Sequence, residues 1–280
     1  MDEATLSARL RDERYFADDG LLTAVYLALT LGRPLLLEGE PGVGKTEIAA
    51  VLSRVLDREL VRLQCYEGLD AGQALYEWNY PRQLLALRGG SGDNTVGDVY
   101  TEEYLLARPL LRSLRTPSVL LVDEVDRADS EFEAFLLEYL ADFRITIPEL
   151  GAIEAEVPPV VVLTSNRTRE LHDALKRRCL YHWIPFPEPE RERAIVCAHV
   201  PSIEEDAAAS LVHAVSGVRR LDLLKRPGIA ESVEWARGAV TLLADGNPWP
   251  VALRRALGLL VKDSDDVAVV HEHFDELVAP

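Results

Sequence analysis

The stretch LLLEGEPGVGKTEIAAVLSRVL, Leu35 to Leu56, decides the fold of this chain. Its leucines predict a short buried strand, the pattern G-x-x-x-x-G-K-T follows from Gly39 to Thr46, and an amphipathic helix begins at Thr46. A strand, a glycine-rich loop and a helix in this order are the setting in which the pattern binds phosphate. The sequence therefore predicts a nucleotide-binding loop here.

Each residue type in this loop has a chemical reason. Gly42 and Gly44 let the backbone curl so that its N–H groups point inward at phosphate, and the helix N-terminus adds its dipole. Lys45 is expected to reach the β and γ phosphates of ATP, and the Thr46 hydroxyl is expected to hold Mg²⁺. The predicted nucleotide-binding residues are Gly39, Glu40, Pro41, Gly42, Val43, Gly44, Lys45 and Thr46.

A second run, SVLLVDEVD, reads as a buried strand that ends in adjacent carboxylates. Asp123 is expected beside the metal and Glu124 beside the attacking water, a pairing that favours hydrolysis over transfer of phosphate to a small molecule. For Asp126 and Asp129, just beyond, we expect a solvated loop. The run VVVLTSN predicts another strand, which delivers Asn166 to the γ-phosphate pocket, where its amide orients water.

The rest of the chain indicates an α/β domain followed by a small helical domain. Short β-branched or leucine-rich runs alternate with helical patterns, as expected of a buried parallel sheet. After Pro185–Glu190 the strand signals stop and amphipathic helical stretches follow. The predicted strands lie in RPLLLE, ELVRLQC, SVLLVDE, PVVVLTSN and CLYHWIPF.

Net charge, apolar runs and cysteine spacing limit the kinds of partner, the location and the thiol chemistry that we expect. The 280 residues carry a formal charge of -17, which disfavours nucleic-acid binding. The charged N-terminus lacks a signal-peptide core, and the longest apolar run, Leu21 to Gly32, is shorter than the ~20 residues of a membrane span. We therefore expect a soluble cytoplasmic protein. Cys65, Cys179 and Cys197 contain no C-x-x-C pair, so we expect reduced thiols without a disulfide or a zinc site.

The order of these elements resembles the AAA+ ATPases over nearly the whole chain. Such proteins typically assemble as rings in which an arginine of one subunit completes the site of its neighbour. In DALKRRCLYHW, Arg178 is the first candidate for that finger and Arg177 the second. The alternative is that both arginines only complement the dipole at a helix C-terminus.

Within that superfamily the sequence looks like the MoxR group and its CoxD-like branch. The resemblance implies a nucleotide-binding domain over residues 1–187, with an insert at about 68–100 and a hairpin at about 143–158, and a helical lid over 188–280. The matching stretches are RLQCYEGLDAGQALYEWNYPRQLL, LVDEVDRAD, LTSNRTREL, LKRRCLYHWIPFP and RPGIAESVEWA.

The aromatic stretch ALYEWNYPRQLL falls in the insert. Trp78 and Tyr80 either contact a client or adaptor, or pack against the insert's own helices. A departure from the family concerns its second sensor, an arginine at the start of a lid helix. Here Lys225 and Arg226 precede Pro227. Either could reach the γ-phosphate, and we take Arg226 as the candidate. The alternative is that neither does and that Lys45 and the neighbour's finger alone neutralise the phosphate charge.

The resemblance implies a homo-oligomeric ring, a hexamer in the family, that hydrolyses ATP with Mg²⁺ to remodel or mature a metalloenzyme. The best-known client of the CoxD-like branch is a molybdenum hydroxylase, carbon monoxide dehydrogenase, and a von Willebrand A-domain protein would be the adaptor. Two other functions stay open, a P-loop small-molecule kinase and the motor subunit of a nucleic-acid machine. Glu124, the finger arginines and the helical lid speak against the first, and the acidic charge against the second.

Overall fold

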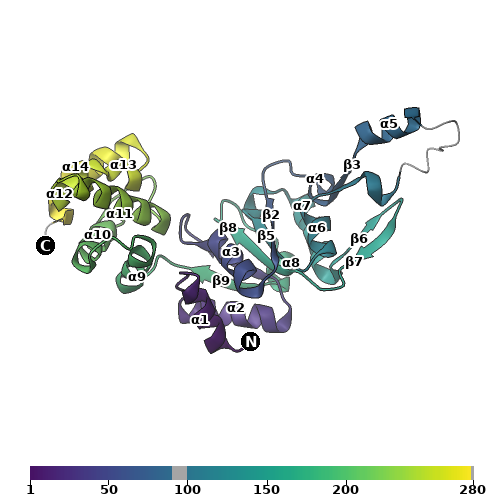
Figure 1. Cartoon of the computed structure of the whole chain (residues 1–280), viewed down its shortest axis with the longest axis horizontal. Coiled ribbons are helices and arrows are strands. Elements are labelled where there is room, and N and C mark those ends of the chain that lie inside the picture. Colours follow the sequence, from purple (N-terminus) through teal and green to yellow (C-terminus); the bar gives the residue numbers. More distant parts are fainter. Residues whose placement is uncertain (90–99, 279–280) are drawn as a thin grey trace. The chain divides into compact units, whose positions relative to one another are not determined.

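The computed structural model describes residues 1–89 and 100–278, and the chain divides into two compact units (Figure 1). The sheet unit, as we call it, comprises Met1–Leu6, Asp19–Glu38 and Thr46–Trp183. The helical unit comprises Ser7–Asp18, Gly39–Lys45 and Ile184–Pro280. The domain boundary predicted between residues 187 and 188 stays a prediction.

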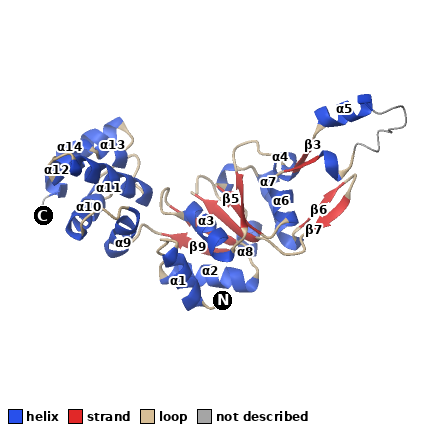
Figure 2. Ribbon diagram, viewed as in Figure 1, coloured by secondary structure: helices blue, strands red, loops and turns tan. Residues whose placement is uncertain are grey.

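The sheet unit is built on a five-stranded sheet in the order β2-β5-β8-β1-β9 (Figure 2). Strand β2 pairs in parallel with β5, β5 with β8, and β8 with β1, so the predicted α/β fold with a parallel sheet is confirmed. The inner strands are almost wholly buried, whereas β2, at an edge, alternates between buried and accessible residues. The strands are β1 (Leu35–Gly39), β2 (Glu59–Gln64), β5 (Ser118–Asp123), β8 (Val160–Ser165) and β9 (Leu180–Ile184).

The chain up to residue 178 also contains helices and four short strands that pair outside this sheet. The helices up to residue 178 are α1 (Glu3–Asp12), α2 (Asp19–Leu31), α3 (Lys45–Leu56), α4 (Ala71–Leu75), α5 (Tyr80–Gly89), η2 (Glu102–Tyr104), α6 (Pro109–Arg115), η3 (Val125–Arg127), α7 (Ser130–Asp142) and α8 (Asp173–Arg178). The strands outside the main sheet are β3 (Tyr76–Trp78), β4 (Leu105–Ala107), β6 (Arg144–Ile147) and β7 (Gly151–Glu154).

Beyond β9 the described chain contains helices and loops, without a further strand. These helices are α9 (Pro189–His199), α10 (Glu205–Val218), α11 (Ile229–Ala244), α12 (Trp249–Arg255), α13 (Leu257–Leu260) and α14 (Ser264–Val278). Trp235 lies in their core, and its indole N–H donates to the Leu253 carbonyl at 2.9 Å. None of the helices in the described parts of the chain combines the length and apolar character that a bilayer span requires.

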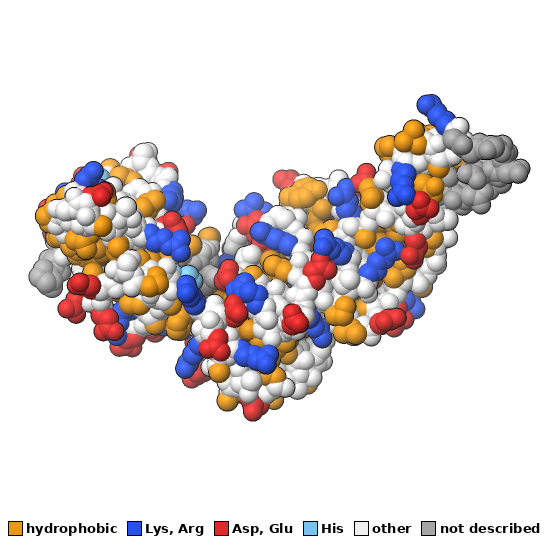
Figure 3. Space-filling view, in the orientation of Figure 1, with side chains coloured by type: hydrophobic (Ala, Val, Ile, Leu, Met, Phe, Trp, Pro, Cys, Tyr) orange, Lys and Arg blue, Asp and Glu red, His pale blue; other side chains and the backbone are white. Residues whose placement is uncertain are grey.

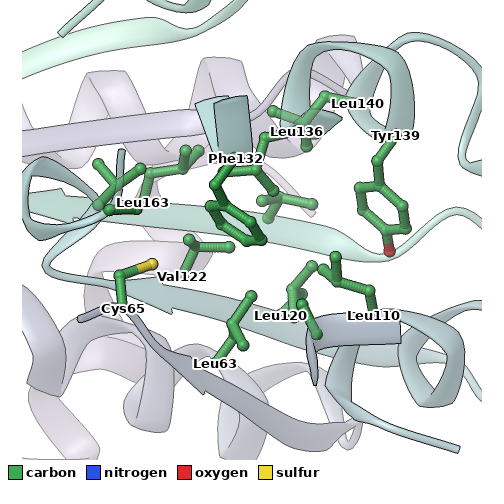
Figure 4. Close-up of a cluster of buried hydrophobic side chains, with 14 of the residues drawn as sticks. Leu63, Cys65, Leu110, Leu120, Val122, Phe132, Leu136, Tyr139, Leu140 and Leu163 are labelled. Atoms are coloured by element: carbon green, nitrogen blue, oxygen red, sulfur yellow. The ribbon is translucent and has the colours of Figure 1, made fainter. Parts of the chain in front are cut away.

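The core of the sheet unit forms where α7 packs on the strands (Figure 4). Phe132 and Leu136 of α7 lie among the side chains of β5 and β8, including Leu120. Tyr139 is fully buried, and its hydroxyl lies 2.7 Å from the Ser113 hydroxyl. Burial raises the pKa of Tyr139, so this phenol stays neutral and its polar atom is satisfied. The core fixes β5 and β8, the two strands that end in the predicted site residues.

A hairpin stands where the sequence predicts one. β6 and β7 pair antiparallel, with Ile147 opposite Gly151. The turn therefore occupies the residues before Gly151, and Gly151 begins the second strand with φ +84°. A glycine tolerates this left-handed conformation without the Cβ penalty that other residues incur.

The predicted insert, residues 68–100, contains α4, β3 and α5, and its residues 90–99 lie outside the described residues. Strand β3 pairs antiparallel with β4, which follows the insert. Trp78 is only 7% exposed, and its ring packs edge-on against Tyr76 and Tyr100 at centroid distances of 6.1 and 5.2 Å. Tyr80, on α5, is 56% exposed, and Figure 3 shows hydrophobic side chains over this helix. Trp78 thus packs in the core, whereas Tyr80 is free for contact with solvent or a partner.

We expect Trp78→Ala to lower the free energy of unfolding by about 3 to 5 kcal/mol, because it removes a buried aromatic ring from a packed cluster. Tyr80→Ala is the matched control, since an exposed side chain typically contributes within about 0.5 kcal/mol. Thermal and chemical unfolding followed by circular dichroism measure both. A Trp78→Ala protein that unfolds at the wild-type midpoint would show that this packing does not stabilise the domain.

Candidate active site

The phosphate loop, residues 39–45, belongs to the helical unit. Gly42 and Gly44 have φ of +78° and +92°, the left-handed conformation that glycine adopts readily. Lys45 is only 6% exposed, and its ammonium group donates to the carbonyls of Gly39 and Glu40 at 2.7 Å each. The loop therefore curls around a buried cation, which is the arrangement that a polyphosphate requires.

The same loop touches the start of α11 within the helical unit. The Ile229 N–H donates to the Gly42 carbonyl at 2.8 Å. A Cβ on Gly228 would lie 2.6 Å from the Gly42 Cα, and a Cβ on Gly42 would lie 2.9 Å from the Gly228 Cα. Only glycine at both positions lets the two backbones approach this closely. Sequence analysis missed Gly228, because its partner lies far away in the chain.

In the sheet unit, Asp123 ends β5 as a buried carboxylate. One carboxylate oxygen, Oδ1, accepts from the hydroxyls of Thr46 and Thr164 at 3.0 and 2.6 Å. The Arg62 guanidinium donates to the other, Oδ2, at 2.5 Å. The hydroxyl of Thr46 and the carboxylate of Asp123 are the hard oxygen ligands that Mg²⁺ prefers, so this pair fits the predicted metal site.

Glu124 follows in the left-handed conformation, with φ +55°. Its carboxylate accepts from the Asn166 amide at 3.3 Å and from the Gln64 amide at 2.9 Å, and the Arg127 guanidinium lies 3.1 Å away. The structure thus brings Asp123, Glu124 and Asn166 together at the carboxyl edge of the sheet. Gln64 was missed by sequence analysis, although a polar residue at the end of an edge strand was a signal for it.

The Asn166 loop is held by Asp126, and here the expectation of a solvated loop is wrong. Asp126 is 2% exposed, and its carboxylate accepts from the backbone N–H groups of Asn166 and Thr168 at 3.2 and 2.8 Å. The Thr168 hydroxyl adds a bond of 2.7 Å. A loop whose N–H groups point inward needs a buried acceptor, and Asp126 supplies it. Asp129 is exposed and caps α7 by accepting from the Phe132 N–H at 2.9 Å.

Arg177 and Arg178 are not brought to this site. They form the last turn of α8, just before β9 begins at Leu180, whose N–H donates to the Pro34 carbonyl ahead of β1 at 2.8 Å. They therefore lie at the amino edge of the sheet, roughly 15 to 20 Å from the carboxyl edge by the rise of a five- or six-residue strand. Both side chains are exposed, as is that of Arg226, which precedes Gly228 in the helical unit.

Two of the cysteines are buried thiols, Cys65 beside this site and Cys179 at the end of α8. Cys65 follows β2 and donates its N–H to the Asp123 carbonyl at 2.9 Å. Burial first, and then the charges of Asp123, Asp126 and Glu124, raise the pKa of the Cys65 thiol to about 12. Burial likewise raises the pKa of Cys179 to about 12. Neither thiol ionises near neutral pH, so neither is suited to act as a nucleophile.

Comparison with known proteins places this site in a family. The family described as AAA domain (dynein-related subfamily) matches residues 34–179, more than half of the chain. The chain therefore belongs to that family, and the AAA+ resemblance seen in the sequence is confirmed at this level. The match runs from the residue before β1 to the residue before β9 and so spans the phosphate loop, the acidic pair and the Asn166 loop.

Individual relatives are more distant. The chain is 27% identical to protein NorQ of Paracoccus denitrificans over 218 residues, which cover 75% of this chain and 74% of NorQ. It is 28% identical to the uncharacterized protein YehL of Escherichia coli over 161 residues, 54% of this chain and 41% of YehL. A mutant of Thermotoga maritima RuvB superposes with a TM-score of 0.55 at 17% identity, covering 99% of this chain and 78% of RuvB. At that identity the likeness shows the fold alone.

Proposed function

We propose that this protein is an ATP-hydrolysing AAA+ ring chaperone of the MoxR type, which remodels or matures a metalloenzyme. The observation that carries the hydrolase part is the group of Asp123, Glu124 and Asn166 at one sheet edge. Asn166 donates to the Glu124 carboxylate, and the Thr164 hydroxyl links the Glu124 N–H to the Asp123 carboxylate, which also accepts from Thr46. Family membership supports an ATPase in general. The nucleotide, the metal and the assembly remain parts of the proposal.

Each residue has a separate task in the proposed hydrolysis. The loop from Gly39 to Lys45 binds the phosphates with its N–H groups and the lysine ammonium, and Thr46 and Asp123 hold Mg²⁺. When bound, Mg²⁺ neutralises charge on the phosphate oxygens. Glu124 accepts a proton from the attacking water, and Asn166 orients that water. Oε1 of Glu124 accepts from the Asn166 amide and keeps a second lone pair with which it can accept from a water.

In the proposed ring, an arginine of the neighbouring subunit supplies further positive charge to the phosphates of ATP. Arg178 lies at the amino edge of the sheet, away from the acidic group of its own subunit, which supports a role at a site on another subunit rather than its own. Arg177 is the second candidate, and Arg226 is the proposed second sensor. The family resemblance supports a hexamer.

The proposed client is a metalloenzyme. Relatedness to NorQ supports a MoxR-type protein, and the CoxD-like stretches support a molybdenum hydroxylase such as carbon monoxide dehydrogenase as the client. We propose a cytoplasmic protein that works with a von Willebrand A-domain adaptor. Loss of metal-loaded client in cells that carry an inactive variant would test this, with metal content of the purified client as the readout.

Phosphate release in the absence of an acceptor distinguishes the proposed ATPase from a small-molecule kinase. A hydrolase releases inorganic phosphate from ATP without any acceptor, whereas a small-molecule kinase needs its second substrate. We expect phosphate release by the purified protein with ATP and Mg²⁺ alone. Release that begins only when a metabolite extract is added would favour the kinase.

Lys45→Ala should abolish detectable ATP binding in calorimetry, because the polyphosphate loses its main compensating cation. The lysine also holds the carbonyls of Gly39 and Glu40, so its removal loosens the loop. Lys262→Ala is the matched control, since Lys262 also donates to a backbone carbonyl, that of Gly258 at 3.1 Å, but is exposed and outside the loop. Unchanged ATP affinity of the Lys45 variant would refute the placement of the nucleotide.

A further inference from the structure

Arg33 connects the turn after α2 with the end of α8. Its guanidinium donates to the carbonyl of Arg177 at 2.7 Å and to that of Arg178 at 3.3 Å. These carbonyls belong to the two residues proposed as fingers, and they lie at a helix C-terminus, where carbonyls lack partners within the helix. One side chain therefore fixes the backbone of both candidates.

The backbone of Arg33 is itself held firmly. Gly32 ends α2 in the left-handed conformation with φ +62°, and the Arg33 N–H donates back to the Ala28 carbonyl at 3.0 Å, the pattern of a Schellman cap. Pro34, the next residue, is buried and pairs through its carbonyl with Leu180 at the start of β9. The guanidinium thus extends from a fixed point beside the sheet.

Favourable electrostatics do not explain why position 33 is an arginine. Lys176, Arg177 and Arg178 already place three cations in the last turn of α8, and Arg33 adds a fourth. In the described residues no carboxylate forms an ion pair with Arg33, Arg177 or Arg178. Repulsion among like charges opposes this arrangement, whereas the fork of an arginine can donate to two carbonyls at once, which a lysine ammonium cannot do with the same rigidity.

We propose that Arg33 is a positioning residue for the trans-acting arginine, holding the end of α8 so that the finger side chain leaves from a defined point. This inference rests on the proposed ring function. Because a displacement of about 1 Å can cost about 10²-fold in rate, loss of the clamp lowers turnover without removing the finger. Asp123, Glu124 and Asn166 of the same subunit lie at the other edge of the sheet, and the clamp touches none of the residues proposed to bind ATP, so the affinity for ATP stays unchanged.

The test uses mixed rings, in which the ATP site and the finger come from different subunits. Arg178→Ala subunits have an intact ATP site and no finger, and Lys45→Ala subunits have a finger and no working site. Mixing them should restore phosphate release. Subunits that carry both Lys45→Ala and Arg33→Gln should restore at most about a tenth as much, because their finger is displaced.

Arg58 provides a matched control. It too follows a left-handed residue after a helix, Asp57, precedes a strand, and donates to a backbone carbonyl, that of Pro158 at 3.4 Å. Subunits with Lys45→Ala and Arg58→Gln should rescue as well as Lys45→Ala alone. Arg33→Lys keeps the charge and serves in the same mixture if the glutamine variant does not fold, with melting temperature and ring assembly measured for each.

The outcomes separate the two proposals. Full rescue by the Lys45→Ala, Arg33→Gln subunits, in rings shown to be mixed, overturns the role of Arg33 and leaves the ring function standing. No rescue by Lys45→Ala alone in mixed rings overturns the trans finger, and the role of Arg33 with it. A general folding defect is excluded if homogeneous Arg33→Gln protein binds ATP normally and recovers turnover when Lys45→Ala subunits supply the finger.

Discussion

Replacing Arg178 with alanine should lower ATP turnover by roughly 10³- to 10⁵-fold, the range that trans-acting arginines contribute to phosphoryl transfer. ATP affinity of the isolated subunit should stay nearly unchanged. The physical reason is the position of Arg178 at the amino edge of the sheet, across from Asp123 and Glu124 of the same subunit. Steady-state phosphate release and calorimetry measure the two quantities.

Arg177→Ala is the comparison for this variant, since Arg177 shares the same helix turn and the same exposure. We expect the smaller loss from Arg177→Ala. The opposite ranking would transfer the finger role to Arg177, and normal turnover in both variants would leave the arginines as cations that complement the dipole of α8.

Glu124→Gln should keep ATP binding and slow hydrolysis by about 10²- to 10⁴-fold, because only proton transfer from the attacking water is lost. The amide is nearly isosteric, so Asp123 keeps its contacts with Thr46 and Thr164. The variant should therefore accumulate as ATP-bound rings, which size-exclusion chromatography with ATP would reveal.

Glu131→Gln is the control for this substitution. Glu131 is an exposed carboxylate in the first turn of α7, and its loss leaves the acidic group intact. We expect wild-type turnover in that protein. Hydrolysis at the wild-type rate by Glu124→Gln would remove Glu124 from the mechanism, even if ATP binding were intact.

The sequence predicts those site residues whose position is set by the strand or loop in which they lie. Asp123, Glu124 and Asn166 each come at or after the end of a short, valine- and leucine-rich run that favours a buried strand, and parallel strands end at the same edge. The glycines and Lys45 follow from a loop whose chemistry is written in consecutive residues. The parallel sheet could be predicted because the hydrophobic run of each strand is continuous in the sequence.

The parts that sequence reasoning missed depend on side chains that meet across long separations. Gln64 reaches Glu124, and Arg33 reaches the end of α8, through contacts that no spacing in the sequence records. For Asp126 the sequence predicts a solvated side chain, and that prediction is wrong. A charged residue just after a strand is usually solvated, but here it is buried because the Asn166 loop presents backbone N–H groups that need an acceptor.

The approach of Gly42 and Gly228 limits how this protein can change by mutation. A methyl group at either position would collide with the backbone of the other glycine, so neither residue can be replaced first and compensated later by a change of side chain at its partner. Any route to a larger residue there must move main chain in the loop and in α11 together. We therefore expect saturation mutagenesis to return glycine alone at both positions, including in a library that varies the two simultaneously.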